Sequence, residues 1–243
     1  MPPKPPTAED RDMLDRWAAL LGRCAPADAS TASATATATA TGQAADDDQA
    51  AAGTDPEPYG LDLLKRWSEP QRRYHTTAHL RAMLDQVDLL AEHAEDADAV
   101  RLAVWYHDAV YQPERSENEE RSARLALRAL ADAGVPDALA EETARLVRLT
   151  VTHHPEPGDR NGEVLCDADL AVLGGSPDAY AAYAAAVREE YSFVPPEAFR
   201  EGRAAVLRQL LDLPALFRTP TAHARYDAPA RANLAAELAE LTR

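Results

Sequence analysis

The chain has 243 residues and a formal net charge of −16 at pH 7, because 41 Asp and Glu outnumber 25 Lys and Arg. A surface this acidic repels a phosphate backbone, which argues against nucleic acid as the main partner. The sequence shows no N-terminal secretion signal, no apolar run of membrane length and only two unrelated cysteines, Cys24 and Cys166, so we expect a cytoplasmic protein without membrane contact or disulfide.

Apolar residues recur at helical spacing in almost every segment, whereas the alternating Val, Ile and Thr runs of strands are nearly absent. The sequence therefore predicts an all-α helical bundle. We divide the sequence into three parts. Residues 1–24 form a tail and a first helix, residues 25–58 form an insertion, and residues 59–243 form the main domain. The insertion is rich in Ala, Thr and acidic residues. It offers too little large apolar surface to offset its ordering entropy, so we expect it to be disordered.

In chain order, the first helix is expected at residues 8–22, and the second begins at Tyr59 and ends before Pro70. A third helix begins near Thr76 or Thr77. A central fourth helix runs from about residue 96 to residue 110 and ends before Pro113. The next helix is predicted to begin at a capping-box pattern at 116–119 and to end at about 133. The remaining helices are predicted at 137–152, 178–191, 196–212 and 227–241.

The central predicted helix carries the dipeptide His107-Asp108. Val100, Ala103 and Val104 share a helical face with His107, so that face is expected to deliver the imidazole to the interior. Burying an imidazole beside a carboxylate is costly unless a cation or a dense hydrogen-bond network compensates. A lone His-Asp pair is weak evidence, because a core histidine bonded to a backbone carbonyl is common. Further candidates lie elsewhere in the chain: His75, His79, His153, His154, Asp167 and Asp169.

Histidine and aspartate together suit a divalent metal, which could be Mn²⁺, Mg²⁺, Fe or Zn²⁺, without selecting among them. The cysteines lack the spacing of a closed structural zinc site. The sequence also has no His-Glu-x-x-His motif, no phosphate-binding loop of the P-loop type and no Gly-x-Ser-x-Gly elbow. A metal site of dispersed His and Asp ligands is therefore the expectation.

Four blocks together resemble an uncharacterised bacterial branch of the HD superfamily of metal-dependent phosphohydrolases: 73–80, 105–111, 118–123 and 166–174. The similarity extends from about Tyr59 to the C-terminus. It implies an HD-like helical bundle that hydrolyses a small phosphorylated substrate, such as a nucleotide, with metal-activated water. It also implies four metal ligands, His79, His107, Asp108 and Asp169. The last is carried onto the second aspartate of Asp167-Ala168-Asp169 and not onto the first.

The Tyr-His-x-x-x-His block is also similar to that of cyclic-nucleotide phosphodiesterases. By position, this resemblance implies that His75 is the general acid for the leaving group and that His79 is a ligand. Asp108 would take part in catalysis by bridging to a second metal. His153 or His154 would bind that metal or a phosphate, although imidazolium at a helix C-terminus is an ordinary alternative.

Two acidic residues are predicted to support the ligands. Glu120 is expected as a hydrogen-bond partner of a ligand histidine, and Asp167 is expected beside the ligand set. Four arginines near the blocks are interpreted as surface or salt-bridging residues and not as substrate clamps: Arg72, Arg73, Arg115 and Arg121. Two other functions stay open, an HD-type di-iron oxygenase and a non-catalytic metal-binding interaction module.

Overall fold

A computed structural model describes residues 6–25 and 54–243, and within these ranges the chain forms helices and no strand. The prediction of an all-α fold is confirmed. The predicted disordered insertion, residues 25–58, lies largely outside the described residues. Its predicted end is wrong, because helix α2 (Glu57–Trp67) already includes Glu57 and Pro58. Proline is well tolerated there, since the first helical turn needs no intrahelical N–H donor.

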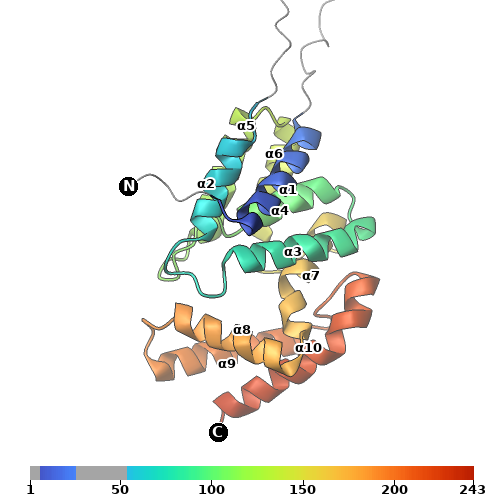
Figure 1. Cartoon of the computed structure of the whole chain (residues 1–243). Coiled ribbons are helices and arrows are strands. Elements are labelled where there is room, and N and C mark those ends of the chain that lie inside the picture. The colour runs from blue at the N-terminus through green and yellow to red at the C-terminus, as the bar shows by residue number, and fades with distance from the viewer. Residues whose placement is uncertain (1–5, 26–53) are drawn as a thin grey trace, which may run out of the picture.

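The helices form two groups joined through the middle of the molecule (Figure 1). The upper group consists of α1 (Ala8–Cys24), α2, α4 (Ala97–Tyr106), α5 (Asn118–Asp132) and α6 (Asp137–Leu149). Helix α3 (Thr77–Leu90) crosses below this group and packs on α4 and α7 (Arg160–Leu170). The lower group consists of α8 (Pro177–Glu190), α9 (Pro196–Asp212) and α10 (Pro220–Leu241). Short 3₁₀ turns η1 (Ala91–His93) and η2 (Ala171–Gly174) follow α3 and α7.

Three tryptophans anchor the core of the upper group. Trp17, Trp67 and Trp105 are at most 1% exposed. The indole N–H of Trp17 donates to the carbonyl of Pro56 at 2.9 Å, and that of Trp67 donates to the carbonyl of Trp105 at 3.0 Å. Because these polar atoms are satisfied, the large rings are buried without an unpaired donor. Helices α1, α2 and α4 are thereby held together at the level where α4 ends.

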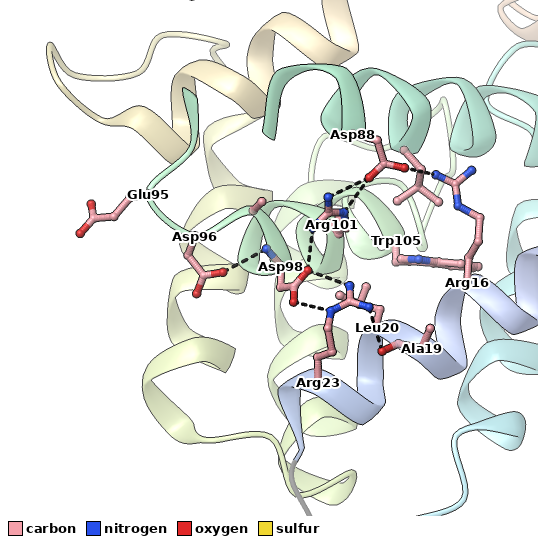
Figure 2. A pocket seen from close by; sticks show the side chains of 12 residues that line it. Arg16, Ala19, Leu20, Arg23, Asp88, Glu95, Asp96, Asp98, Arg101 and Trp105 are labelled. Atoms are coloured by element: carbon pink, nitrogen blue, oxygen red, sulfur yellow. Dashed lines mark hydrogen bonds and ion pairs between the residues drawn. The ribbon is translucent and has the colours of Figure 1, made fainter. Parts of the chain in front are cut away.

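Ion pairs surround the contact between α1 and the helices α3 and α4, and Figure 2 shows most of them. Arg16 donates to Asp85 and Asp88, Arg23 donates to Asp98, and Arg101 donates to both Asp88 and Asp98. These arginines line a groove of about 760 Å³, and each is neutralised by carboxylates. Partly exposed pairs contribute about 0–1 kcal/mol each, so burial of Trp17 holds α1 more strongly than they do.

Gly60 marks the closest approach of α1 and α2. A Cβ atom at this position would lie 2.7 Å from Cδ1 of Trp17 and 2.9 Å from Cδ2 of Leu14. We expect Gly60→Ala to lower the free energy of unfolding by about 1–3 kcal/mol, because overpacking outweighs the gain in helix propensity. Gly22→Ala is the matched control, since a Cβ on Gly22 of α1 meets no atom within 4 Å. It should raise stability by about 0.5–1 kcal/mol. Urea denaturation measures both, and equal shifts would contradict the close contact.

The helices differ from those predicted in several places: α7 was not predicted, α6 ends at Leu149 and not at residue 152, and the end of α4 and the start of α10 lie elsewhere. Helix α4 ends at Tyr106 and not near residue 110, so His107 and Asp108 lie in the turn that follows it. Helix α10 begins at Pro220, seven residues before its predicted start. The hydroxyl of Thr219 accepts the N–H of Ala222, and Pro220 at the first helical position favours this start.

The predicted capping box before α5 is also wrong. The helix begins at Asn118 without a side-chain cap. Asn118 instead bonds backward, accepting the N–H of Gln112 and donating to the carbonyls of Gln112 and Arg115. The amide thus closes the loop that leads from the His107 turn into α5.

Among the described helices, none combines the length and the apolarity that crossing a membrane requires. Cys24 and Cys166 are both buried and free of disulfide bonds.

Candidate metal centre

Three elements bring together His79, His107 and Asp169. His79 lies in the first turn of α3, His107 follows the last residue of α4, and Asp169 is the penultimate residue of α7. One ligand atom from each lies within 4.8 Å of the other two. The Nε2 atom of His79 is 3.3 Å from Oδ1 of Asp169. Two imidazoles and a carboxylate at this spacing are a donor set for a divalent cation.

The two imidazoles each present a buried nitrogen without a hydrogen-bond partner among the described residues. These atoms are Nε2 of His79 and Nε2 of His107. The Nδ1 atom of His107 lies 2.8 Å from the carbonyl of Val104, and a carbonyl can only accept. The hydrogen of a neutral His107 therefore sits on Nδ1, which leaves the lone pair of Nε2 directed at the centre. This arrangement fits a metal.

Asp108 extends the donor set. Its Oδ2 atom lies 3.2 Å from Nε2 of His107 and 3.8 Å from Nε2 of His75. The side chain of Asp108 is 13% exposed. It is more exposed than those of His79 and His107 and less exposed than those of Asp169, His75 and His153. All four residues that the family resemblance implies as ligands therefore lie in one region of the fold.

The carboxylates give this region a negative electrostatic potential, which acts on the pKa values of the histidines. Burial would lower the pKa of His107, but Asp108 outweighs it and raises the pKa to about 9. Burial would raise the pKa of Asp169, but the hydrogen bond with His153 and the nearby imidazole of His79 hold it well below its usual range. Burial prevails at His79, whose pKa is lowered. A cation bound among these groups would replace the proton that His107 otherwise attracts.

His75 lies beside the cluster in the turn that precedes α3, and Glu190 fixes its orientation. Nδ1 of His75 is 2.7 Å from Oε2 of Glu190, the last residue of α8. Oε1 of Glu190 accepts the backbone N–H groups of Arg73, Tyr74 and His75 at 2.7, 2.9 and 3.0 Å. Burial lowers the pKa of His75, but Asp108 and Glu190 outweigh it, and the pKa is raised.

Sequence reasoning missed Glu190. One signal could have indicated it, because Glu190 shares a helical face with Tyr183 and Val187, and this face is otherwise apolar. A carboxylate in the last turn of a helix is also unfavourable for the helix dipole, so its presence there calls for a local partner. The partner is the turn that holds His75.

The interpretation of Arg72 as a surface or salt-bridging residue is wrong about the surface, but Arg72 does pair with Glu69, whose Oε2 atom is 3.4 Å from Nη2 of Arg72. Arg72 is buried, and its guanidinium donates to the carbonyls of His75 and Asp108 at 2.9 and 2.8 Å. The guanidinium also lies over the rings of Trp67 and Tyr111, 5.2 Å from each centroid. It joins the His75 turn to the Asp108 turn, because one planar group with several donors can serve both carbonyls.

Of the two adjacent histidines, the structure brings His153 to the centre. Its Nε2 atom is 2.7 Å from Oδ2 of Asp169, the oxygen not used by His79. His153 has φ of +49°, a left-handed conformation that is uncommon outside glycine, and this turns it away from its neighbour. His154 is exposed, and its Nδ1 atom lies 3.3 Å from Nη2 of Arg218.

The two predicted supporting acids do not contact the ligand histidines. Glu120 is half exposed and accepts from Arg124 and Arg148, at 2.7 Å each, on the surface of α5 and α6. Asp167 is buried, but its oxygens accept the N–H groups of Arg218 and Thr219 at 2.8 and 2.7 Å. Residues two apart on a helix point about 200° from each other, so Asp167 faces the start of α10 while Asp169 faces His79 and His153.

A cavity of about 480 Å³ adjoins the centre. Tyr74, His75, His153 and Asp169 form the part of its wall nearest the cluster. A small molecule in this cavity would therefore lie against His75 and against Asp169, one of the four predicted metal ligands. The cavity volume is in the range of small-molecule binding sites.

Comparison with protein-family models finds no matching family. Comparisons with curated proteins and with solved structures find no match either.

Proposed function

We propose that the protein is a metal-dependent phosphohydrolase acting on a small phosphoester. The observation that supports this most directly is the pair of buried, unpartnered Nε2 atoms of His79 and His107 facing Asp169. Burying such atoms without a partner is unfavourable, and a divalent cation would compensate both at once. His79, His107, Asp108 and Asp169 would hold it.

When bound, the metal would polarise a phosphoryl oxygen and lower the pKa of water. The residues of the chain set the geometry for this chemistry. Val104 fixes the ring of His107, and His153 positions Asp169 by binding its second oxygen. Glu190 holds Nδ1 of His75, which leaves Nε2 of His75 to donate a proton to the leaving-group oxygen.

The test is hydrolysis of a phosphoester panel by purified protein loaded with Mn²⁺, combined with elemental analysis of the bound metal. We expect release of phosphate that stops with a chelator and returns when the metal is restored. Asp169→Asn should lose both metal and activity. Asp178→Asn, an exposed position on α8, is the matched control and should behave as the unaltered protein.

Two results would contradict the proposal. Bound metal without hydrolysis of any ester would favour a non-catalytic interaction module. Tightly bound iron with visible absorption, again without hydrolysis, would favour the di-iron oxygenase.

A further inference from the structure

The cavity beside the metal centre is walled mainly by apolar and aromatic side chains. Tyr183 and Val187 come from α8, Tyr191 and Val194 from the connection after it, and Phe199 and Val206 from α9. We call this space, between η2, α8 and α9, the α8–α9 cavity. Val206 is 45% exposed, so an apolar residue remains accessible at its wall. Accessible apolar surface that is continuous with a catalytic cluster is typical of a ligand site.

Positive charge in the α8–α9 cavity is already neutralised. Apart from His75 and His153, the basic residue among those described in its wall is Arg203. Arg203 donates through Nε and Nη2 to both oxygens of Glu237, at 2.9 Å each, and its guanidinium lies over the ring of Tyr183. A substrate with several phosphates would place uncompensated negative charge against this wall, because a paired guanidinium offers little net attraction.

The ring hydroxyls nearest Arg203 are also engaged. Tyr183 accepts from Nη1 of Arg203 at 3.4 Å. Sugar hydroxyls of a bound ligand would lose hydration against a wall that is mainly apolar, which is unfavourable unless each finds a new partner. Aromatic or aliphatic groups lose nothing comparable, and their transfer from water to an apolar wall is favourable.

We propose that the substrate is a phosphomonoester with an apolar, ring-containing alcohol as its leaving group, and that this group binds in the α8–α9 cavity. The inference rests on the proposed function. The single phosphate would lie at the metal centre, where Asp169 and His75 form the cavity wall, and the organic group would extend toward Phe199 and Val206. The cavity volume of about 480 Å³ lies in the range of small-ligand sites.

Gly202 provides a specific test. It lies on α9 in the cavity wall, and a Cβ atom added to it meets no heavy atom within 4 Å. Gly202→Phe therefore adds a ring at the cavity without a clash at the backbone. Gly22→Phe is the matched control, because Gly22 is also an exposed helical glycine with free space around it and lies on α1, away from the cavity.

Two measurements are made on the Mn²⁺-loaded protein. The first compares the turnover of 1-naphthylmethyl phosphate with that of methyl phosphate. The second compares the calorimetric binding affinities of the corresponding non-hydrolysable phosphonates. We expect the naphthyl compounds to be favoured by at least about tenfold in both, since apolar pockets discriminate at this level. Gly202→Phe should remove this preference and leave the methyl compounds within about twofold, and Gly22→Phe should change neither.

The two proposals fail separately in this experiment. Selective phosphonate binding that Gly202→Phe abolishes, without hydrolysis of either ester, would support the cavity assignment and contradict the hydrolase. Hydrolysis with equal use of methyl and naphthyl esters, or with a preference for adenosine mono- or triphosphate, would overturn the cavity assignment alone.

If Gly202→Phe does not fold by circular dichroism, Val206→Asp replaces it, with Leu61→Asp as the control of similar exposure on α2. Retention of the naphthyl preference in Val206→Asp would overturn the assignment.

Discussion

His107→Ala should purify without the metal that we propose the unaltered protein to bind. The substitution removes Nε2, one of the two buried imidazole nitrogens without a partner, and leaves the carboxylates of Asp108 and Asp169 without this imidazole between the ends of α4 and α7. Loss of an outer partner alone typically weakens metal binding about 10–100-fold, so loss of a direct ligand should exceed about 100-fold. Elemental analysis after dialysis and calorimetric titration with Mn²⁺ measure the effect.

His223→Ala is the control for this substitution. The side chain of His223 is 58% exposed on α10, and its Nδ1 atom lies 3.8 Å from Oδ1 of Asp227, away from the candidate ligands. The control should keep full metal content. Unchanged metal content in a correctly folded His107→Ala protein would remove His107 from the ligand set and, with it, the strongest support for the metal centre.

His75→Ala should keep its metal and lose activity in proportion to the leaving group's need for a proton. An alkoxide is a poor leaving group at neutral pH, and a positioned acid contributes about 10²–10⁴-fold. We therefore expect a loss of this size with alkyl phosphates and a much smaller loss with nitrophenyl phosphate, whose leaving group departs without a proton. Steady-state kinetics on the two ester types, with metal content measured in parallel, test this expectation.

Glu190→Gln separates this role from a merely structural one. Glutamine can still accept the backbone N–H groups of residues 73–75 but no longer places a carboxylate at Nδ1 of His75. It should show the same leaving-group pattern with a smaller loss. Equal losses on both ester types in His75→Ala, or loss of its metal, would remove His75 from the role of acid.

Helical periodicity was sufficient to predict the fold class, because helices such as α3 bury apolar residues at helical spacing, here Leu80, Met83, Leu84 and Val87. It was less reliable at helix ends, which depend on local bonds. The end of α4 at Tyr106 and the start of α10 at Pro220 illustrate this, since both are set by turn and cap geometry. Thr219 followed by Pro220 is a sequence signal for the start of a helix, but the spacing of apolar residues does not contain it.

Residue types and block order were enough to suggest His79, His107, Asp108 and Asp169, and the structure places them in one region. The groups that orient them could not be derived in the same way. Glu190 lies more than a hundred positions from the turn it binds. Arg72 donates to two backbone carbonyls, and because every residue has a carbonyl, the sequence does not indicate which ones Arg72 binds. Such partnerships depend on how α8 returns to the beginning of α3, which is a property of the tertiary structure.

The bond between His75 and Glu190 also affects when the site is completed as the chain is made. The two residues are separated by 115 positions. At translation rates of about 5–20 residues per second, roughly 6–23 s pass between the synthesis of the histidine and that of the glutamate that orients it. The upper helices can begin to pack on the ribosome during this interval, with the His75 turn still lacking the acceptor for its three N–H groups. Assembly of the site is thus tied to late synthesis of the chain.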